Sequence, residues 1–113
     1  MTTPGKGLDN LINSLLVKTR EGRLPWFTTA SPLSYSVAFS SSSVTIRRAG
    51  PTVFPDYVLS IQNDSGEEIE TCTAFTRTDP RYSALEELFK YARRKATAVD
   101  ETIAQIQEEL AEV

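Results

Sequence analysis

Residues 79–113 read DPRYSALEELFKYARRKATAVDETIAQIQEELAEV, and this stretch decides how the rest of the chain is organised. Asp79 and Pro80 place a capping residue and a proline where helices begin, and Ser83 with Glu86 matches a capping box one turn later. No glycine or proline follows. The stretch is therefore predicted to form one long helix, spanning about 45 Å if roughly thirty residues are helical.

The apolar residues of this helix recur in steps of three or four, which places them on one face. In the first half, Phe89 and Tyr91 widen the face, as suits packing on a sheet. In the second half, residues 96–113, the face narrows to a seam that suits packing on a single helix, and this tail is expected to project. The predicted partner-binding seam consists of Val99, Ile103, Ile106 and Leu110.

The two halves of this helix differ in the sign of their charged residues. Basic residues cluster between Lys90 and Lys95, whereas the only charged residues of 96–113 are acidic. Acids near the C-terminal end oppose the helix dipole, so the tail is expected to fray unless another molecule or the N-terminal helix covers its seam. Antiparallel pairing of two copies would bring the acids of one chain towards the basic cluster of the other, whereas parallel pairing would stack acid on acid.

Length and composition limit the possible classes of protein. The length of 113 residues predicts a single domain spanning 1–113, with residues 1–7 loose. A single cysteine rules out an internal disulfide, and the absence of histidine removes the commonest general base and metal ligand. No apolar run approaches the length of about eighteen residues that a membrane span needs. The expectation is a cytoplasmic protein without a membrane segment, metal site or cofactor.

Upstream of the long helix, the pattern predicts a short helix that ends near Gly22. Its apolar face consists of Leu8, Leu11, Ile12, Leu15 and Leu16. Trp26 is interpreted as a core anchor, with a ligand platform as the alternative. Stretches of alternating polarity at 33–39, 44–47, 57–61 and 69–75 predict strands. Their short connections predict an antiparallel meander of three to five strands, and so an α+β fold.

Residues 63–66, Asn-Asp-Ser-Gly, match a type I turn followed by a left-handed glycine. This turn predicts that Leu59 pairs with Thr71, which would place Cys72 on the face of the sheet away from the core. The predicted core face of the hairpin consists of Tyr57, Leu59, Ile61, Ile69 and Phe75.

The sequence contains no motif that indicates catalysis. It has no glycine-rich phosphate loop, no Ser/His or Cys/His set, and no zinc-ligand spacing. The carboxylates of Glu67, Glu68 and Glu70 are interpreted as a solvated strand end rather than as a cation site. A basic patch would form if the long helix crossed the second strand, and its candidate residues are Arg47, Arg48, Arg93, Arg94 and Lys95.

Three segments also resemble a known group of proteins. They read LLxKTxxGxxxW at 15–26, YVLSI at 57–61 and GxEI at 66–69. In these segments the chain resembles small uncharacterised bacterial proteins with a helix–sheet–helix layout. The resemblance implies a bacterial or phage cytoplasmic origin and carries no function.

Taken together, the patterns predict a small non-enzymatic protein-interaction module. It would self-associate, as a homodimer or other homo-oligomer, or dock a protein partner through the C-terminal helix. The alternative is a nucleic-acid-associated accessory protein that uses the basic patch. The mild net charge of −3 favours the first hypothesis, because electrostatically driven nucleic-acid binders are usually basic.

Overall fold

The computed structural model describes residues 4–51, 53–75 and 78–113. Within these residues the chain forms a helix, a run of strands and two further helices, which confirms the predicted α+β class. In chain order the elements are α1 (Pro4–Arg20), β1 (Phe27–Thr28), β2 (Ser34–Ala38), β3 (Ser42–Ala49), β4 (Asp56–Asn63), β5 (Glu68–Ala74), α2 (Tyr82–Ala96) and α3 (Val99–Ala111).

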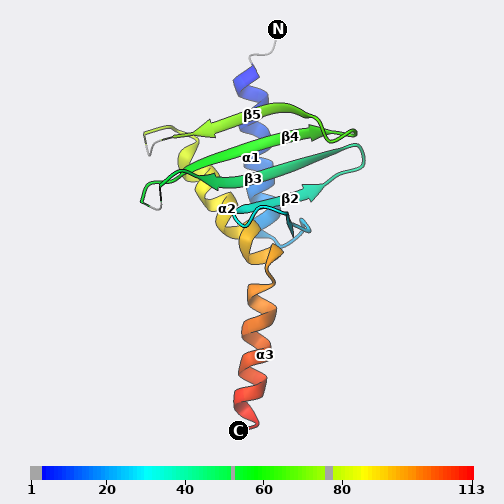
Figure 1. Ribbon diagram of the computed structural model, residues 1–113, viewed down its shortest axis with the longest axis vertical. Coiled ribbons are helices and arrows are strands. Elements are labelled where there is room, and N and C mark those ends of the chain that lie inside the picture. Colours follow the sequence, from blue (N-terminus) through cyan, green and yellow to red (C-terminus); the bar gives the residue numbers. More distant parts are fainter. Residues whose placement is uncertain (1–3, 52, 76–77) are drawn as a thin grey trace.

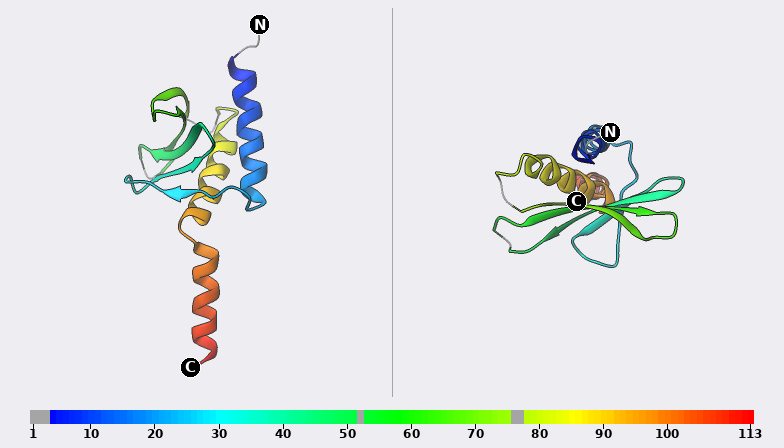
Figure 2. Two further views of the ribbon diagram at one scale, coloured as in Figure 1. Left: turned by 90° about the vertical axis from the view of Figure 1, so that its right-hand side faces the viewer. Right: turned by 90° about the horizontal axis from the view of Figure 1, so that it is seen from above.

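The strands form one antiparallel sheet in the order β1-β2-β3-β4-β5, as predicted for a meander. Both α1 and α2 lie on the same face of this sheet, while α3 continues beyond its edge as an arm (Figure 1; Figure 2). The molecule measures 62 × 35 × 25 Å, with a radius of gyration of 15.7 Å. A compact domain of this length would have a radius of gyration of about 13 Å, so the arm dominates the shape.

The hydrophobic core lies between the sheet and the two helices that cover it. Strand alternation places Val37, Ile46 and Leu59 on the covered face, and all three are almost completely buried. Leu85 and Leu88 of α2 meet them from the helix side, and neither is exposed to solvent. The first half of the predicted long helix therefore packs on the sheet, as its wide apolar face indicated.

Trp26 occupies the core position predicted for it, with 4% of its surface exposed. Its indole Nε1 donates a hydrogen bond to Thr19 Oγ1 at 3.0 Å. The Thr19 hydroxyl donates in turn to the Leu15 carbonyl oxygen at 2.5 Å. The polar edge of the ring is thus satisfied inside the core, as buried tryptophans require.

Helix α1 begins earlier than its apolar pattern suggested. It starts at Pro4, so residues 4–7, expected to be loose, belong to the helix. Residues 1–3, the remainder of the expected loose segment, lie outside the described residues. Proline is well suited to a first helical turn, where its missing N–H group leaves no hydrogen bond unmade.

The turn between β4 and β5 has the predicted form. Gly66 has a φ of +82°, and its N–H group donates to the Asn63 carbonyl oxygen at 3.0 Å. The Asn63 N–H group donates to the Glu67 carbonyl oxygen at 2.9 Å, which closes the hairpin. Asn63 Oδ1 also accepts from the N–H groups of Ser65 and Glu67, so this side chain fixes the loop.

A second irregularity, beyond the turn, shifts the register of β5. Gln62 pairs with Glu68, but the next residue, Ile61, pairs with Glu70, so Ile69 has no partner in the ladder. One extra residue in a strand turns every following side chain to the opposite face. As a result, the predicted register does not apply beyond the bulge.

The predicted faces of β5 are therefore wrong. Leu59 pairs with Cys72 instead of Thr71, and Cys72 is buried on the core face with 6% of its surface exposed. Ile69 and Phe75, both predicted to face the core, are 61% and 65% exposed. The smaller side chains of β5, not its larger ones, fill the space beneath the helices.

The prediction of one long C-terminal helix is also wrong, because the helix breaks at Thr97 and Ala98. Ala98 adopts a left-handed conformation with φ 52°, which costs an L-residue about 1–2 kcal/mol and ends the helical path. The Arg93 carbonyl oxygen accepts from both the N–H group of Thr97 at 2.9 Å and its Oγ1 at 2.6 Å, so Thr97 caps the end of α2. Across the break, Arg94 Nη2 contacts Asp100 Oδ1 at 2.6 Å.

The second face of the sheet is not covered by α1 or α2 and carries mainly polar side chains. Ser36 and Thr45 hydroxyls lie 2.6 Å apart on neighbouring strands, and Thr45 also donates to Gln62 Oε1 at 3.1 Å. Hydrogen bonds from Ser60 and Thr71 lower the pKa of Glu68 at the edge of this face. A face built from such groups is compatible with water, which is the usual arrangement for an antiparallel sheet with helices on one side.

Candidate functional site

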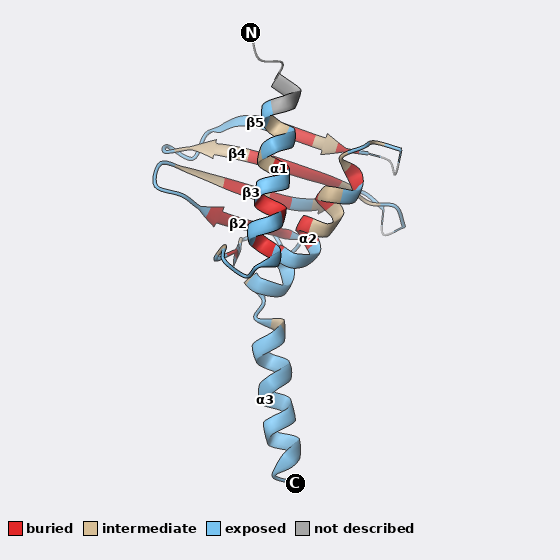
Figure 3. Ribbon diagram, turned by 180° about the vertical axis from the view of Figure 1, so that it is seen from behind, coloured by how far each residue is buried: buried red, intermediate tan, exposed pale blue. Residues whose placement is uncertain are grey.

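Helix α3 contributes no residue to the hydrophobic core. None of its thirteen residues, all of which the structure describes, is buried. In Figure 3 the exposed surface is continuous along almost the whole arm, whereas the sheet and α2 carry the buried residues. The N-terminal helix packs on α2, at the end of the molecule away from the arm, so it does not cover α3.

The predicted seam lies along one side of this arm. Ile103, Ile106 and Leu110 are 46%, 50% and 66% exposed, and Val99 at the base is half-buried. We call these four residues the α3 seam. Isolated helices shorter than about 12–15 residues are marginal in water even with favourable sequences. A helix of this length is therefore marginal unless its apolar side is packed, and the described part of the chain leaves Ile103, Ile106 and Leu110 exposed.

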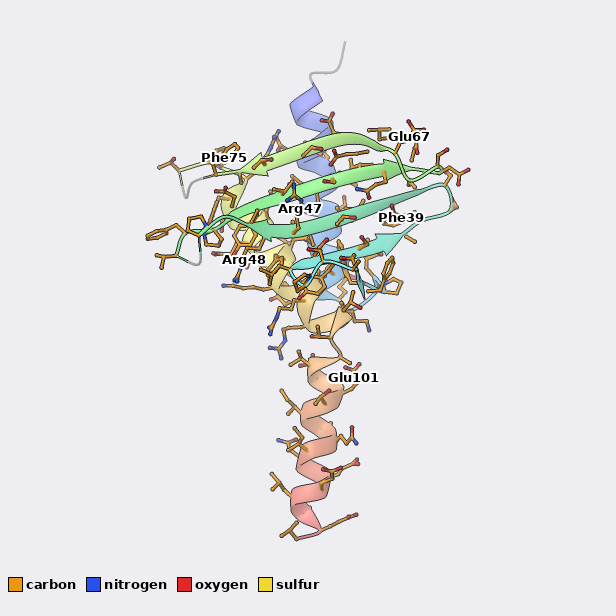
Figure 4. The ribbon with its side chains drawn as sticks, in the orientation of Figure 1. Phe39, Arg47, Arg48, Glu67, Phe75 and Glu101 are labelled. Carbon is orange, nitrogen blue, oxygen red and sulfur yellow. The ribbon has the colours of Figure 1, made fainter. Side chains whose placement is uncertain are left out.

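The electrostatics of the arm add to this requirement. Asp100 and Glu101 suit the first turn of α3, but Glu108, Glu109 and Glu112 lie at the end where the helix dipole is negative. The last turn of α2 is basic instead, with Arg93, Arg94 and Lys95. The arm is thus an acidic helix that follows a basic helix end, and Glu101 lies in its first turn (Figure 4).

The five predicted patch residues do not form one continuous surface. Arg47 and Arg48 are adjacent on β3 and point to opposite faces of the sheet; Arg47 lies on the uncovered face (Figure 4). Arg94 is engaged by Asp100 at the helix break, and Lys95 is exposed in the same turn. Only Arg48 and Arg93 come together.

Arg48 and Arg93 meet in a cleft of about 360 Å³ where the end of α2 crosses β3 and β4. The residues that line it are Leu33, Arg48, Tyr57, Phe89, Lys90 and Arg93, and we call it the basic cleft. The guanidinium carbon of Arg48 lies 5.9 Å from the centre of the Phe89 ring, a cation–π distance that holds this arginine in place.

Tyr57 forms part of the cleft wall through its hydroxyl. Burial raises the pKa of Tyr57, the nearby Glu86 carboxylate raises it further, and Arg48 opposes both effects. The hydroxyl therefore stays protonated at neutral pH, and it makes no hydrogen bond to another described residue. Among the described residues no fully buried side-chain oxygen lacks a partner, so this hydroxyl opens onto the cleft.

The sequence did not predict the basic cleft as a site, because its residues come from four separate parts of the chain. One signal was available: Arg48 has the same strand parity as Val44 and Ile46, which face the core. A charged residue at an inward position of a strand is unusual and marks a place where the core opens to solvent.

The acidic turn shows no arrangement for binding a cation. Glu67, Glu68 and Glu70 are all exposed at the free end of the hairpin, where Figure 4 marks Glu67. Within residues 4–51, 53–75 and 78–113, no group of three or more His, Cys, Asp or Glu side chains is placed to hold a metal ion. Nor does any helix in these ranges have the length and apolar character needed to cross a bilayer.

Comparisons of the chain with protein-family models, with curated proteins and with solved structures found no match. The α3 seam and the basic cleft are the two features of the described residues that indicate a function.

Proposed function

We propose that this protein is a small non-enzymatic interaction module that self-associates through α3. The observation that carries the proposal is a helix with no buried residue whose apolar side chains share one face. Each fully buried aliphatic side chain contributes about 1.5–3 kcal/mol, and the side chains of the α3 seam gain only part of this while they remain exposed. Pairing two seams would bury eight such side chains per dimer.

The charges favour a second copy, oriented antiparallel, as the occupant of the seam. In that orientation Glu108, Glu109 and Glu112 of one chain approach the basic last turn of α2 in the other. The acids then lie close to cations, which offsets their unfavourable position at the end of the helix dipole. A parallel pair would place acidic residues beside their own copies, and so it would lose this attraction.

The size of the seam limits the expected strength of association. Helix α3 has thirteen residues and so measures about 20 Å, shorter than most stable coiled coils. Interfaces that bury less than about 1,200 Å² are usually weak or transient. We therefore expect a reversible dimer that dissociates on dilution.

Sedimentation velocity over a range of protein concentrations tests the proposal. The wild-type chain is expected to shift from monomer at low micromolar concentration to dimer near millimolar concentration. High salt should weaken this shift only partly, because burial of the apolar seam does not depend on charge. A wild-type chain that remains monomeric at the highest soluble concentration would overturn self-association and leave a different protein as the partner of α3.

The alternative function, an accessory protein bound to nucleic acid, has less support. It relied on one basic patch, and Arg47 and Arg48 lie on opposite faces of the sheet. Nucleic-acid binding normally needs cations arrayed along the path of a phosphate backbone. Arg48, Lys90 and Arg93 instead converge on a single cleft.

A further inference from the structure

We propose that the basic cleft binds the phosphate group of a small phosphorylated molecule. This inference does not rest on self-association, because the cleft belongs to the sheet and α2, whereas the α3 seam lies on the arm. Three cationic side chains from two elements, β3 and α2, surround one concave space. Concave sites with a few convergent polar groups are the usual places where small ligands bind.

The first argument is that the cations of the cleft lack partners. Elsewhere on the molecule, Arg20, Arg23, Arg81 and Arg94 each contact a carboxylate within 3.2 Å. In the described part of the chain no such ion pair engages Arg48, Lys90 or Arg93. Four arginines elsewhere on the molecule are thus paired with carboxylates, whereas the three cations that converge on the cleft are not.

The second argument is that Arg48 is held in a position that is costly without an anion. It sits at an inward position of β3 and is only partly exposed, beside the buried rings of Tyr57 and Phe89. Removing part of the water around a guanidinium carries a desolvation cost, which a bound anion would offset. The open hydroxyl of Tyr57 adds a neutral hydrogen-bond donor to the same wall.

The third argument concerns the amount of charge. The three cations carry a charge of about +3, and the Glu86 carboxylate near Tyr57 reduces the local sum to about +2. A phosphate monoester carries about −1.5 to −2 at neutral pH and presents three acceptor oxygens. A single carboxylate would balance only half of this charge. Arginine also binds phosphate oxygens through paired N–H donors, which makes the match geometric as well as electrostatic.

The size and the remaining wall define the rest of the ligand. The volume of about 360 Å³ lies at the lower end of the range for small-molecule sites, about 300–1,000 Å³. Leu33, 38% exposed at the rim, offers an apolar surface to the part of the ligand beyond the phosphate. A compact monophosphate with an apolar or ring-shaped body fits this description.

The test uses adenosine monophosphate as a probe, with adenosine and inorganic phosphate for comparison, followed by NMR chemical shifts of the ¹⁵N-labelled full chain. We expect shifts at the basic cleft with the monophosphate and with inorganic phosphate, and none with adenosine. Arg48→Met should weaken binding of the monophosphate by about 10-fold or more, since a hydrogen bond between charged groups contributes about 1.5–3 kcal/mol.

Arg47→Met provides a matched control, because it removes the same charge from the neighbouring residue on the opposite face of the sheet. The affinity of Arg47→Met for the monophosphate should stay within about 2-fold of the wild type, because the exposed charge on the opposite face is screened by solvent and salt. If Arg48→Met fails to fold, Arg93→Met removes a cation from the exposed side of α2 and should give the same loss. The double variant Ile103→Asp with Ile106→Asp should bind the probe normally, which separates this inference from self-association.

Any one of four results would overturn the proposal. The first is the absence of shifts at millimolar monophosphate, and the second is an equal response to adenosine. The third is an equal loss of affinity in Arg47→Met and Arg48→Met, which would indicate nonspecific attraction. Binding of a single-stranded oligonucleotide without binding of either phosphate probe would also reject the small-molecule site and favour nucleic acid.

Discussion

The double substitution Ile103→Asp with Ile106→Asp is expected to abolish self-association while leaving the domain folded. Both side chains lie at the middle of the α3 seam and neither belongs to the hydrophobic core. In a dimer the change removes four buried aliphatic side chains at about 1.5 kcal/mol or more each, a loss of roughly 6 kcal/mol. This raises the dissociation constant by about four orders of magnitude, so the variant should sediment as a monomer at every soluble concentration.

A matched control comes from the same helix. Ala104→Asp with Gln105→Asp adds the same two charges on the side of α3 opposite the seam, and it should retain the wild-type dimer. Thermal unfolding at low micromolar concentration, where both variants are expected to be monomeric, should give similar midpoints, because α3 contributes no residue to the core. Equal loss of dimer in the two variants would mean that net charge, and not the seam, governs association.

Leu59→Ala is expected to cause the largest loss of stability among single substitutions in the sheet. Leu59 lies at the centre of β4, between Ile46 and Cys72 on the neighbouring strands, and only 1% of its surface is exposed. Truncation of such a leucine costs about 2–5 kcal/mol, from lost burial and from the cavity that remains. Denaturant unfolding followed by tryptophan fluorescence would measure it, since Trp26 belongs to the same core.

Leu33→Ala serves as the comparison, because it makes the same chemical change at a residue that is 38% exposed. It should cost less than about 1 kcal/mol, the usual range for sites outside the core. A loss of stability below about half a kcal/mol for Leu59→Ala would contradict the assignment of the covered sheet face.

The strand pattern predicted the covered face of β4 because β4 is regular over Tyr57 and Leu59, so residues two apart share a face, even though Val58 between them is also buried. The same rule failed for β5, since it ranks residues by hydrophobicity and cannot detect an extra residue in the ladder. The structure buries Cys72 and Ala74 instead of Ile69 and Phe75. Arg81 Nη1 donates to Cys72 Sγ at 3.4 Å, a tertiary contact from the start of α2 that no local pattern encodes.

The break between α2 and α3 was not predictable from the usual signals. Neither glycine nor proline occurs there, and alanine rarely adopts the left-handed conformation seen at Ala98. One irregularity lay close by, the four-residue step from Ala92 to Ala96 that interrupts the heptad-like spacing. Beyond the break, the α3 seam has the residues and the exposure that the narrow apolar face suggested.

The two candidate sites differ in how far the sequence could predict them. The four residues of the α3 seam lie in one segment, so their helical spacing alone was enough to predict it. The basic cleft depends on where Leu33, Arg48 and Tyr57 meet α2. These residues come together because of the path of the strands and the angle at which α2 crosses them. Local sequence patterns do not specify that angle.

Disulfide cross-linking tests the antiparallel pairing of α3 most directly. Val99→Cys and Leu110→Cys are each introduced into a Cys72→Ala background. The Leu110→Cys chain carries a tag that makes it larger, so that the mixed and symmetric products differ in size. The two variants are mixed and oxidised under native conditions. Antiparallel pairing places Val99 of one chain near Leu110 of the other, so the mixed disulfide should dominate over both symmetric products. Dominant Val99→Cys homodimers would contradict the orientation, and the absence of any cross-link at concentrations near millimolar would contradict self-association through α3.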